Sequence, residues 1–116
     1  MKLLFIQTGA PHGSINAQEG LDALLMGSAF TQCSLLFTAE GVLQLVKDQA
    51  TSDLGTKDVS KTFGALQDYG VEDIYCRSSS LQRYGLTPRD LLLDPIIIDD
   101  NKTQALIKEH DQVLTF

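Results

Sequence analysis

Cys76 is the residue of this 116-residue chain whose neighbours best suit covalent chemistry. It ends a predicted strand that begins at Val71, and it is followed by Arg77 and a serine triplet that favours the start of a helix. Helix-terminal N–H groups and a nearby cation both favour thiolate, so these neighbours predict a lowered thiol pKa. Such a thiolate could accept and pass on a persulfide sulfur. The alternative is a partly buried small residue with no chemical role, which is the commoner situation for cysteine.

Two further residues of chemical interest are Cys33 and His12. Cys33 begins the second predicted strand, at the opposite edge of the sheet from Cys76, which separates the sulfurs by roughly 15 Å and forbids a disulfide without rearrangement. We interpret Cys33 as structural. His12 stands between Pro11 and Gly13, where its ring could shuttle protons or shape a loop, and we interpret His12 and Gly13 as loop or interface residues.

The remaining polar groups do not form a metal or cofactor motif. Asp99 and Asp100 stand where a helix is expected to begin, which is typical of a cap that complements the helix dipole. Glu19 follows Asn16 at capping-box spacing, and we assign Glu19 and Asp22 to an interface or loop role. The cysteine spacing fits no zinc site, and the loop at residues 8–13 lacks nucleotide-binding glycine spacing. We therefore expect no metal and no cofactor.

Strands and helices alternate along the chain. Short apolar runs bounded by turn residues predict buried strands, and apolar residues at helical spacing predict helices between them. This alternation predicts an α/β fold with a mainly parallel five-stranded sheet between two helical layers, and reactive groups gather beyond the carboxyl ends of such strands. The strand order is left open. The predicted strands are 3–6, 33–37, 71–76, 96–98 and 113–116, and the predicted helices are 17–30, 42–46, 60–69, 78–84 and 99–109, with a long exposed loop at 47–58.

Length and composition predict one cytoplasmic domain spanning residues 1–116. The chain carries 15 acidic and 9 basic residues, a net charge of −6, without a basic cluster, which disfavours direct binding to a phosphate backbone. Neither a signal peptide nor an apolar run of membrane-spanning length is present. Any nucleic acid is then reached through partner proteins, and the two cysteines are expected to stay reduced.

Several sequence blocks resemble the TusC/DsrF family in the order in which that family carries them. The first two are at residues 10–13 (APHG) and 19–25 (EGLDALL), and a third at 37–45 (FTAEGVLQL) looks like the family's segment after the second strand. The blocks at 80–86 (SLQRYGL) and 111–116 (DQVLTF) are similar to its short third-strand helix and its closing strand. The resemblance therefore covers nearly the whole chain.

This resemblance implies a DsrE/DsrF-like fold and membership of a complex of three related small subunits, usually a heterohexamer. The implied partners are sister subunits resembling TusB and TusD (DsrE and DsrH) and a downstream TusE-like sulfur acceptor. In the Tus branch such a complex relays persulfide sulfur toward 2-thiolation of the tRNA wobble uridine, with tRNA reached only indirectly. In the Dsr branch it serves intracellular sulfur oxidation.

The resemblance also bears on which subunit carries sulfur. The sulfur-carrying cysteine belongs chiefly to TusD/DsrE chains, so a TusC-like chain is expected to be a non-catalytic structural partner. However, Cys76 stands five residues before Leu81, which resembles the spacing of the active cysteine in the TusD/DsrE branch. A sulfurtransferase subunit using Cys76 is therefore an alternative. A third hypothesis is a flavodoxin-like small-molecule binder that uses the loop around His12.

Overall fold

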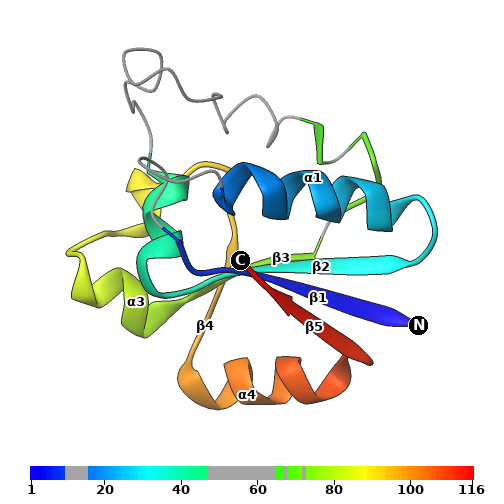
Figure 1. The fold of residues 1–116 in the computed structure, drawn as a ribbon. Helices are drawn as coiled ribbons and strands as arrows, with labels where there is room; N and C mark the ends of the chain where they lie inside the picture. Colours follow the sequence, from blue (N-terminus) through cyan, green and yellow to red (C-terminus); the bar gives the residue numbers. More distant parts are fainter. Residues whose placement is uncertain (10–15, 47–64, 67, 72) are drawn as a thin grey trace.

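Five parallel strands form one sheet at the centre of the computed structural model, which describes residues 1–9, 16–46, 65–66, 68–71 and 73–116 (Figure 1). The strand order is β4-β3-β2-β1-β5, and every neighbouring pair is parallel. Residues 16–18 are described by their backbone only. The strands are β1 (Lys2–Gln7), β2 (Gln32–Phe37), β3 (Asp73–Arg77), β4 (Ile96–Ile98) and β5 (Gln112–Thr115).

Helices cover both faces of this sheet, as predicted. Figure 1 shows α1 on one face and α4 on the other. The predicted α/β architecture with a five-stranded sheet between helical layers is confirmed, and the sheet is parallel throughout. The helical elements are α1 (Asn16–Ser28), the 3-10 helix η1 (Ala39–Leu45), α3 (Ser78–Arg83), the 3-10 helix η3 (Pro88–Asp90) and α4 (Asp100–Glu109).

Most element boundaries differ from the sequence prediction by one to three residues. The segment predicted as a helix over 42–46 is the longer 3-10 helix η1, and α1 ends two residues before Phe30. Asn16, predicted as a cap, is itself the first helical residue of α1. Shifts of one or two residues are common at helix ends, where the last turn tightens or frays, whereas η1 begins three residues earlier than predicted. The predicted loop at 47–58 and the start of the predicted helix 60–69 lie outside the described residues.

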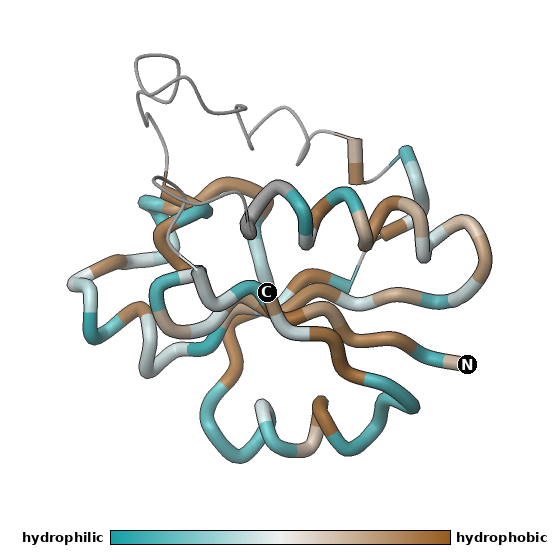
Figure 2. The backbone as a smooth tube through the Cα atoms, in the orientation of Figure 1, coloured by the Kyte–Doolittle hydropathy of each residue, from teal (hydrophilic) through white to brown (hydrophobic). Residues whose placement is uncertain are grey.

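The core has two parts, one on each face of the sheet. Successive residues of a strand point to opposite faces, so Phe5 packs with Leu21 and Leu24 beneath α1, whereas Leu4 and Ile6 pack on the side of Leu106 in α4. This two-sided burial explains why the inner strands β1 and β2 are largely apolar runs rather than alternating ones. In Figure 2 the strands are mostly hydrophobic, while α4 is largely hydrophilic on its outer surface.

Capping residues fix where several helices begin and end. The Asp99 carboxylate accepts a hydrogen bond from the backbone N–H of Lys102 at 2.7 Å, so Asp99 rather than Asp100 is the N-cap of α4. Gly85 closes α3 with a φ of 66°, and Gly70 adopts a φ of 79°. These left-handed conformations favour glycine, as the sequence predicted at both positions. Among the described residues, no helix is long and apolar enough to cross a membrane.

Candidate functional site

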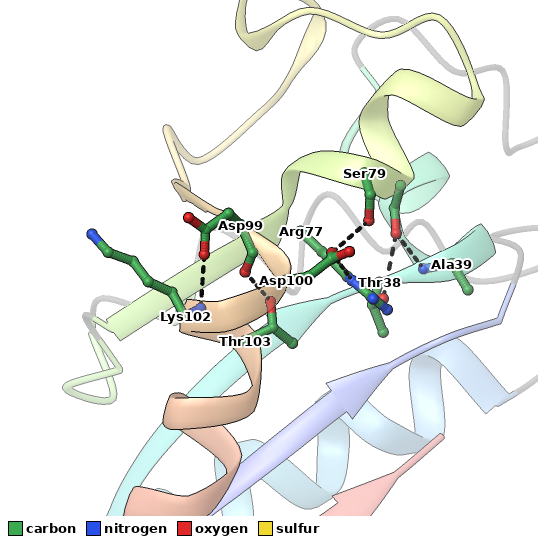
Figure 3. A network of polar contacts seen from close by, with 9 residues as sticks. Thr38, Ala39, Arg77, Ser79, Asp99, Asp100, Lys102 and Thr103 are labelled. Carbon is green, nitrogen blue, oxygen red and sulfur yellow. Dashed lines mark hydrogen bonds and ion pairs between the residues drawn. The ribbon is translucent and has the colours of Figure 1, made fainter.

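Polar side chains meet where β2, β3 and β4 end, the edge at which parallel sheets hold reactive groups. The Ser80 hydroxyl accepts a hydrogen bond from the Ala39 backbone N–H at 2.9 Å and lies 3.4 Å from the Thr38 hydroxyl. The Arg77 guanidinium Nε and the Ser79 hydroxyl donate to Asp100 at 2.8 and 2.9 Å. These contacts link the segments that follow three strands (Figure 3).

The charges of this network are satisfied within it. Hydrogen bonds from Arg77 and then from Ser79 lower the pKa of Asp100, so its carboxylate is ionised and engaged at neutral pH. The serine triplet that was predicted to start a helix does so, with Arg77 as the N-cap residue of α3. Ser80 also holds Ala39 in a left-handed conformation with a φ of 52°, which is uncommon for alanine. The arrangement ties the strand ends together rather than presenting a free nucleophile.

The structure places Cys76 in the core beneath α1, with none of its surface exposed. Burial raises the pKa of its thiol from the ordinary value of 9.0 to about 12. The expectation of a lowered pKa is therefore wrong, and strand geometry gives the reason. Because neighbouring strand residues face opposite ways, Arg77 points away from Cys76 and pairs with Asp100 on the other face.

Cys33 is also buried beneath α1, near the start of β2. Burial raises the pKa of this thiol as well. Cys76 is the register partner of Phe37, four residues along β2 from Cys33, which corresponds to about 13 Å along the strands. Both cysteines are free thiols, in agreement with the prediction that no disulfide joins them. Cys33 and Cys76 are the two cysteines of the chain, and both are buried. Neither thiol is therefore accessible in this conformation.

The other predicted site residues do not converge on Cys76. His12 and Gly13 lie outside the described residues. Glu19 and Asp22 lie on the exposed side of α1, one helical turn apart, where a partner could reach them. Their interface role stays a prediction. Within the described parts of the chain, no three histidine, cysteine or acidic side chains are placed to hold a metal ion.

Sequence reasoning missed a buried polar pair at the carboxyl end of β1. Gln7 is 1% exposed and Gln44 is fully buried, and the Gln44 amide donates to the Gln7 carbonyl oxygen Oε1 at 3.3 Å and to the Gly9 backbone oxygen at 2.8 Å. Gly20 and Gly41 both pack against Gln7. A Cβ atom at Gly41 would lie 1.9 Å from the Gln7 backbone oxygen, and one at Gly20 would lie 2.5 Å from the Gln7 amide nitrogen.

These contacts explain the glycines in two of the sequence blocks. Gly20 belongs to the block at 19–25 and Gly41 to the block at 37–45, and the two blocks meet on Gln7. The sequence indicated this buried polar pair only through Gln7, a glutamine that follows the apolar run of the first strand. A buried polar side chain requires hydrogen-bond partners, which explains the matching Gln44.

Solved structures of other small α/β proteins share this fold. It matches the crystal structure of the ychN protein from E. coli with a TM-score of 0.85 and 17% identity, covering 100% of this chain and 99% of that one. It also matches the structure of MTH1491, a protein of unknown function from Methanobacterium thermoautotrophicum, with a TM-score of 0.64 and 16% identity over 99% and 98% of the two chains. At these identities the likeness shows the fold alone.

The sequence carries the assignment further. The chain belongs to the DsrE/DsrF-like family, whose family model matches residues 1–116. It is 35% identical to a TusC homolog from Vibrio vulnificus strain YJ016, over 99% of this chain and 98% of that protein. It is 36% identical to the intracellular sulfur oxidation protein DsrF of Allochromatium vinosum, over 99% and 96%. The predicted resemblance to the TusC/DsrF family is confirmed.

Proposed function

We propose that this chain is a TusC-like subunit of a cytoplasmic sulfur-relay hetero-oligomer of the TusBCD type, which supports persulfide transfer for 2-thiolation of the tRNA wobble uridine. The observation that carries the proposal is the full-length match to relatives named TusC, which includes 31% identity over the whole TusC of Buchnera aphidicola. The partners are sister subunits resembling TusB and TusD and a TusE-like acceptor of the sulfur.

The environment of the two thiols supports a structural rather than a sulfur-carrying role for this subunit. A sulfur carrier needs a thiolate that its donor and acceptor can reach. Cys76 is fully buried, and burial raises its pKa to about 12, so its thiolate is scarce at neutral pH. The alternative in which Cys76 carries persulfide requires the core beneath α1 to open. We therefore propose that the chain positions a cysteine of a sister subunit.

Exposed apolar side chains near the end of α1 support an assembly role. Phe30 is 90% exposed and Met26 is 72% exposed. Aromatic and methionine side chains are enriched where subunits meet, and both are costly to leave in water. The net charge of −6 argues that a partner, rather than this chain, contacts RNA.

Co-expression with the two sister subunits of the same genome tests the assembly role. The three chains are expected to co-purify in one complex, and the double variant Met26→Ser, Phe30→Ser is expected to weaken it because it removes apolar contact area. Gln104→Ser on α4, also exposed, is the control and should leave the complex intact. A wild-type chain that remains a stable monomer beside both sisters contradicts the proposal.

The second candidate function is a DsrF-like role in sulfur oxidation, which the relative named DsrF favours. Deleting the gene distinguishes the two roles. For the tRNA role we expect loss of 2-thiouridine from tRNA, measured by mass spectrometry of digested nucleosides, with restoration by the intact gene. Unchanged 2-thiouridine together with a defect in oxidising reduced sulfur would favour the DsrF-like role.

A further inference from the structure

A groove with both apolar and charged walls runs between α4 and the edge strand β4. It has a volume of about 300 Å³, and its walls include Tyr75, Ile96 and Ile98 from the strands and Ala105 and Leu106 from α4. β4 is an edge strand of the sheet, and α4, which follows it in the chain, lies on one face of that sheet (Figure 1). Ile96 is 53% exposed there, a large aliphatic side chain at the edge of a sheet.

Opposite charges stand at the two ends of this groove. Lys102 lies on the first turn of α4 and Glu109 on the last, and both line the groove. They are seven residues apart, or about 10.5 Å along the helix. Asp73 adds to the acidic end: burial, then the charges of Asp73 and Glu109, raise the pKa of Tyr75. Among the described residues, neither Lys102 nor Glu109 forms an ion pair.

Ala105 lies between these two charges on the same stripe of α4. Residues 102, 105 and 109 recur at helical spacing, so they form one continuous line along the flank of α4 that faces the groove. A small residue at the centre of such a line lets a second helix approach closely. Ile107 lies on the opposite flank, because each residue advances 100° around the helix.

We propose that this groove is a two-fold contact between two copies of the chain, in which the two α4 helices pack antiparallel and cross near Ala105. A two-fold axis reverses the direction of the second copy, so Lys102 of each copy meets Glu109 of the other. The positive end of the groove in one copy thus faces the negative end of the groove in the other. The contact also covers Ile96 of both copies. It requires no sister subunit and does not depend on the sulfur-relay function.

Disulfide trapping tests the crossing point. Ala105→Cys places two thiols at the axis, within the Cα separation that a disulfide spans. We expect this variant to form a covalent dimer under mild oxidation, seen on a non-reducing gel. Gln104→Cys, also exposed but turned about 100° around the helix, is the matched control and should remain uncrosslinked. The two native thiols are buried and contribute little background.

Charge exchange tests the pairing. Light scattering and sedimentation of the purified chain should show a dimer, whose dissociation constant rises about tenfold in Lys102→Glu or Glu109→Lys because each creates two like-charge contacts. The double exchange K102E/E109K should bring the constant back close to the native value. Ile96→Asp should abolish the dimer, whereas Ile107→Asp, the same change at a 38% exposed site on the other flank, should not. Circular dichroism confirms that each variant is folded.

Several outcomes would overturn the proposed contact. These are a monomer at all concentrations, a dimer lost with Ile107→Asp but not with Ile96→Asp, equal crosslinking at positions 104 and 105, or a double exchange that fails to restore association. A chain that is monomeric alone but co-purifies with its sister subunits would refute the two-fold contact and leave the sulfur-relay proposal standing. A chain that forms a dimer by itself but does not co-purify with its sister subunits would refute the sulfur-relay assembly and leave the two-fold contact standing.

Discussion

Replacing Gly41 with alanine is expected to lower the free energy of unfolding by about 3 kcal/mol, the upper end of the usual cost of overpacking. The added Cβ would lie 1.9 Å from the Gln7 backbone oxygen and 2.5 Å from its carbonyl carbon. That oxygen accepts a hydrogen bond from the Thr38 N–H at 3.1 Å, at the junction of β2 and η1. The added Cβ would therefore clash with backbone atoms of Gln7, which no side-chain rotation can move away. The clash can be removed only if η1 shifts away from the end of β1.

Gly9→Ala is the matched control for this prediction. A Cβ atom at Gly9 meets no atom within 4 Å, so its substitution is expected to change stability by less than about 0.5 kcal/mol. Urea denaturation followed by circular dichroism gives both values. Equal stability of the Gly41→Ala and Gly9→Ala variants would show that the close approach of η1 to β1 is not as the structure has it.

Alkaline pH is expected to destabilise the protein through Cys76. In the unfolded chain the thiol ionises near its ordinary pKa of 9.0, whereas in the folded chain its pKa is about 12. The unfolded state therefore binds fewer protons between these values, and stability falls as pH rises, by up to about 1.4 kcal/mol per pH unit. The contribution is fully present below pH 9.0 and is lost progressively toward about pH 12.

Comparison with Cys76→Ala isolates this effect from other alkaline transitions. Between about pH 7.5 and about pH 10.5, the wild type should lose about 2 kcal/mol more stability than the variant, which lacks the titrating group. Burial also raises the pKa of Cys33 and, with nearby acids, that of Tyr75, and both groups remain in the variant. Urea unfolding at the two pH values measures the difference. Parallel losses in both proteins would mean that water reaches Cys76 in the folded state.

The strands could be predicted from the sequence because their signal is local. Ile96 to Ile98 is a β-branched run after a proline, and it forms β4 with the predicted bounds. The strand order could not be predicted in the same way, since it depends on which distant segments pair. Likewise, the contact of Gly41 with Gln7 joins residues 34 positions apart, and no local pattern encodes it.

The direction of the pKa shift of Cys76 could in part have been predicted from the sequence. Cys76 was predicted to end its strand and lies one residue before the end of β3, but the lowered pKa was inferred from neighbours in sequence rather than from the face of the strand. Ile74 and Cys76 share the face beneath α1, whereas Asp73, Tyr75 and Arg77 share the other face. The alternation of apolar and polar residues over 73–77 indicates this division. Full burial, by contrast, depends on α1 and η1, which only the folded structure supplies.

We propose that this chain supports a sulfur relay without carrying the sulfur. The most direct test is sulfur transfer by the complex of this chain with its two sister subunits, in which both Cys33 and Cys76 have been replaced by alanine. We expect the assembled complex to pass sulfur to the TusE-like acceptor as fast as the wild type. Loss of transfer from a complex that is still fully assembled would refute this proposal and assign the sulfur to this chain.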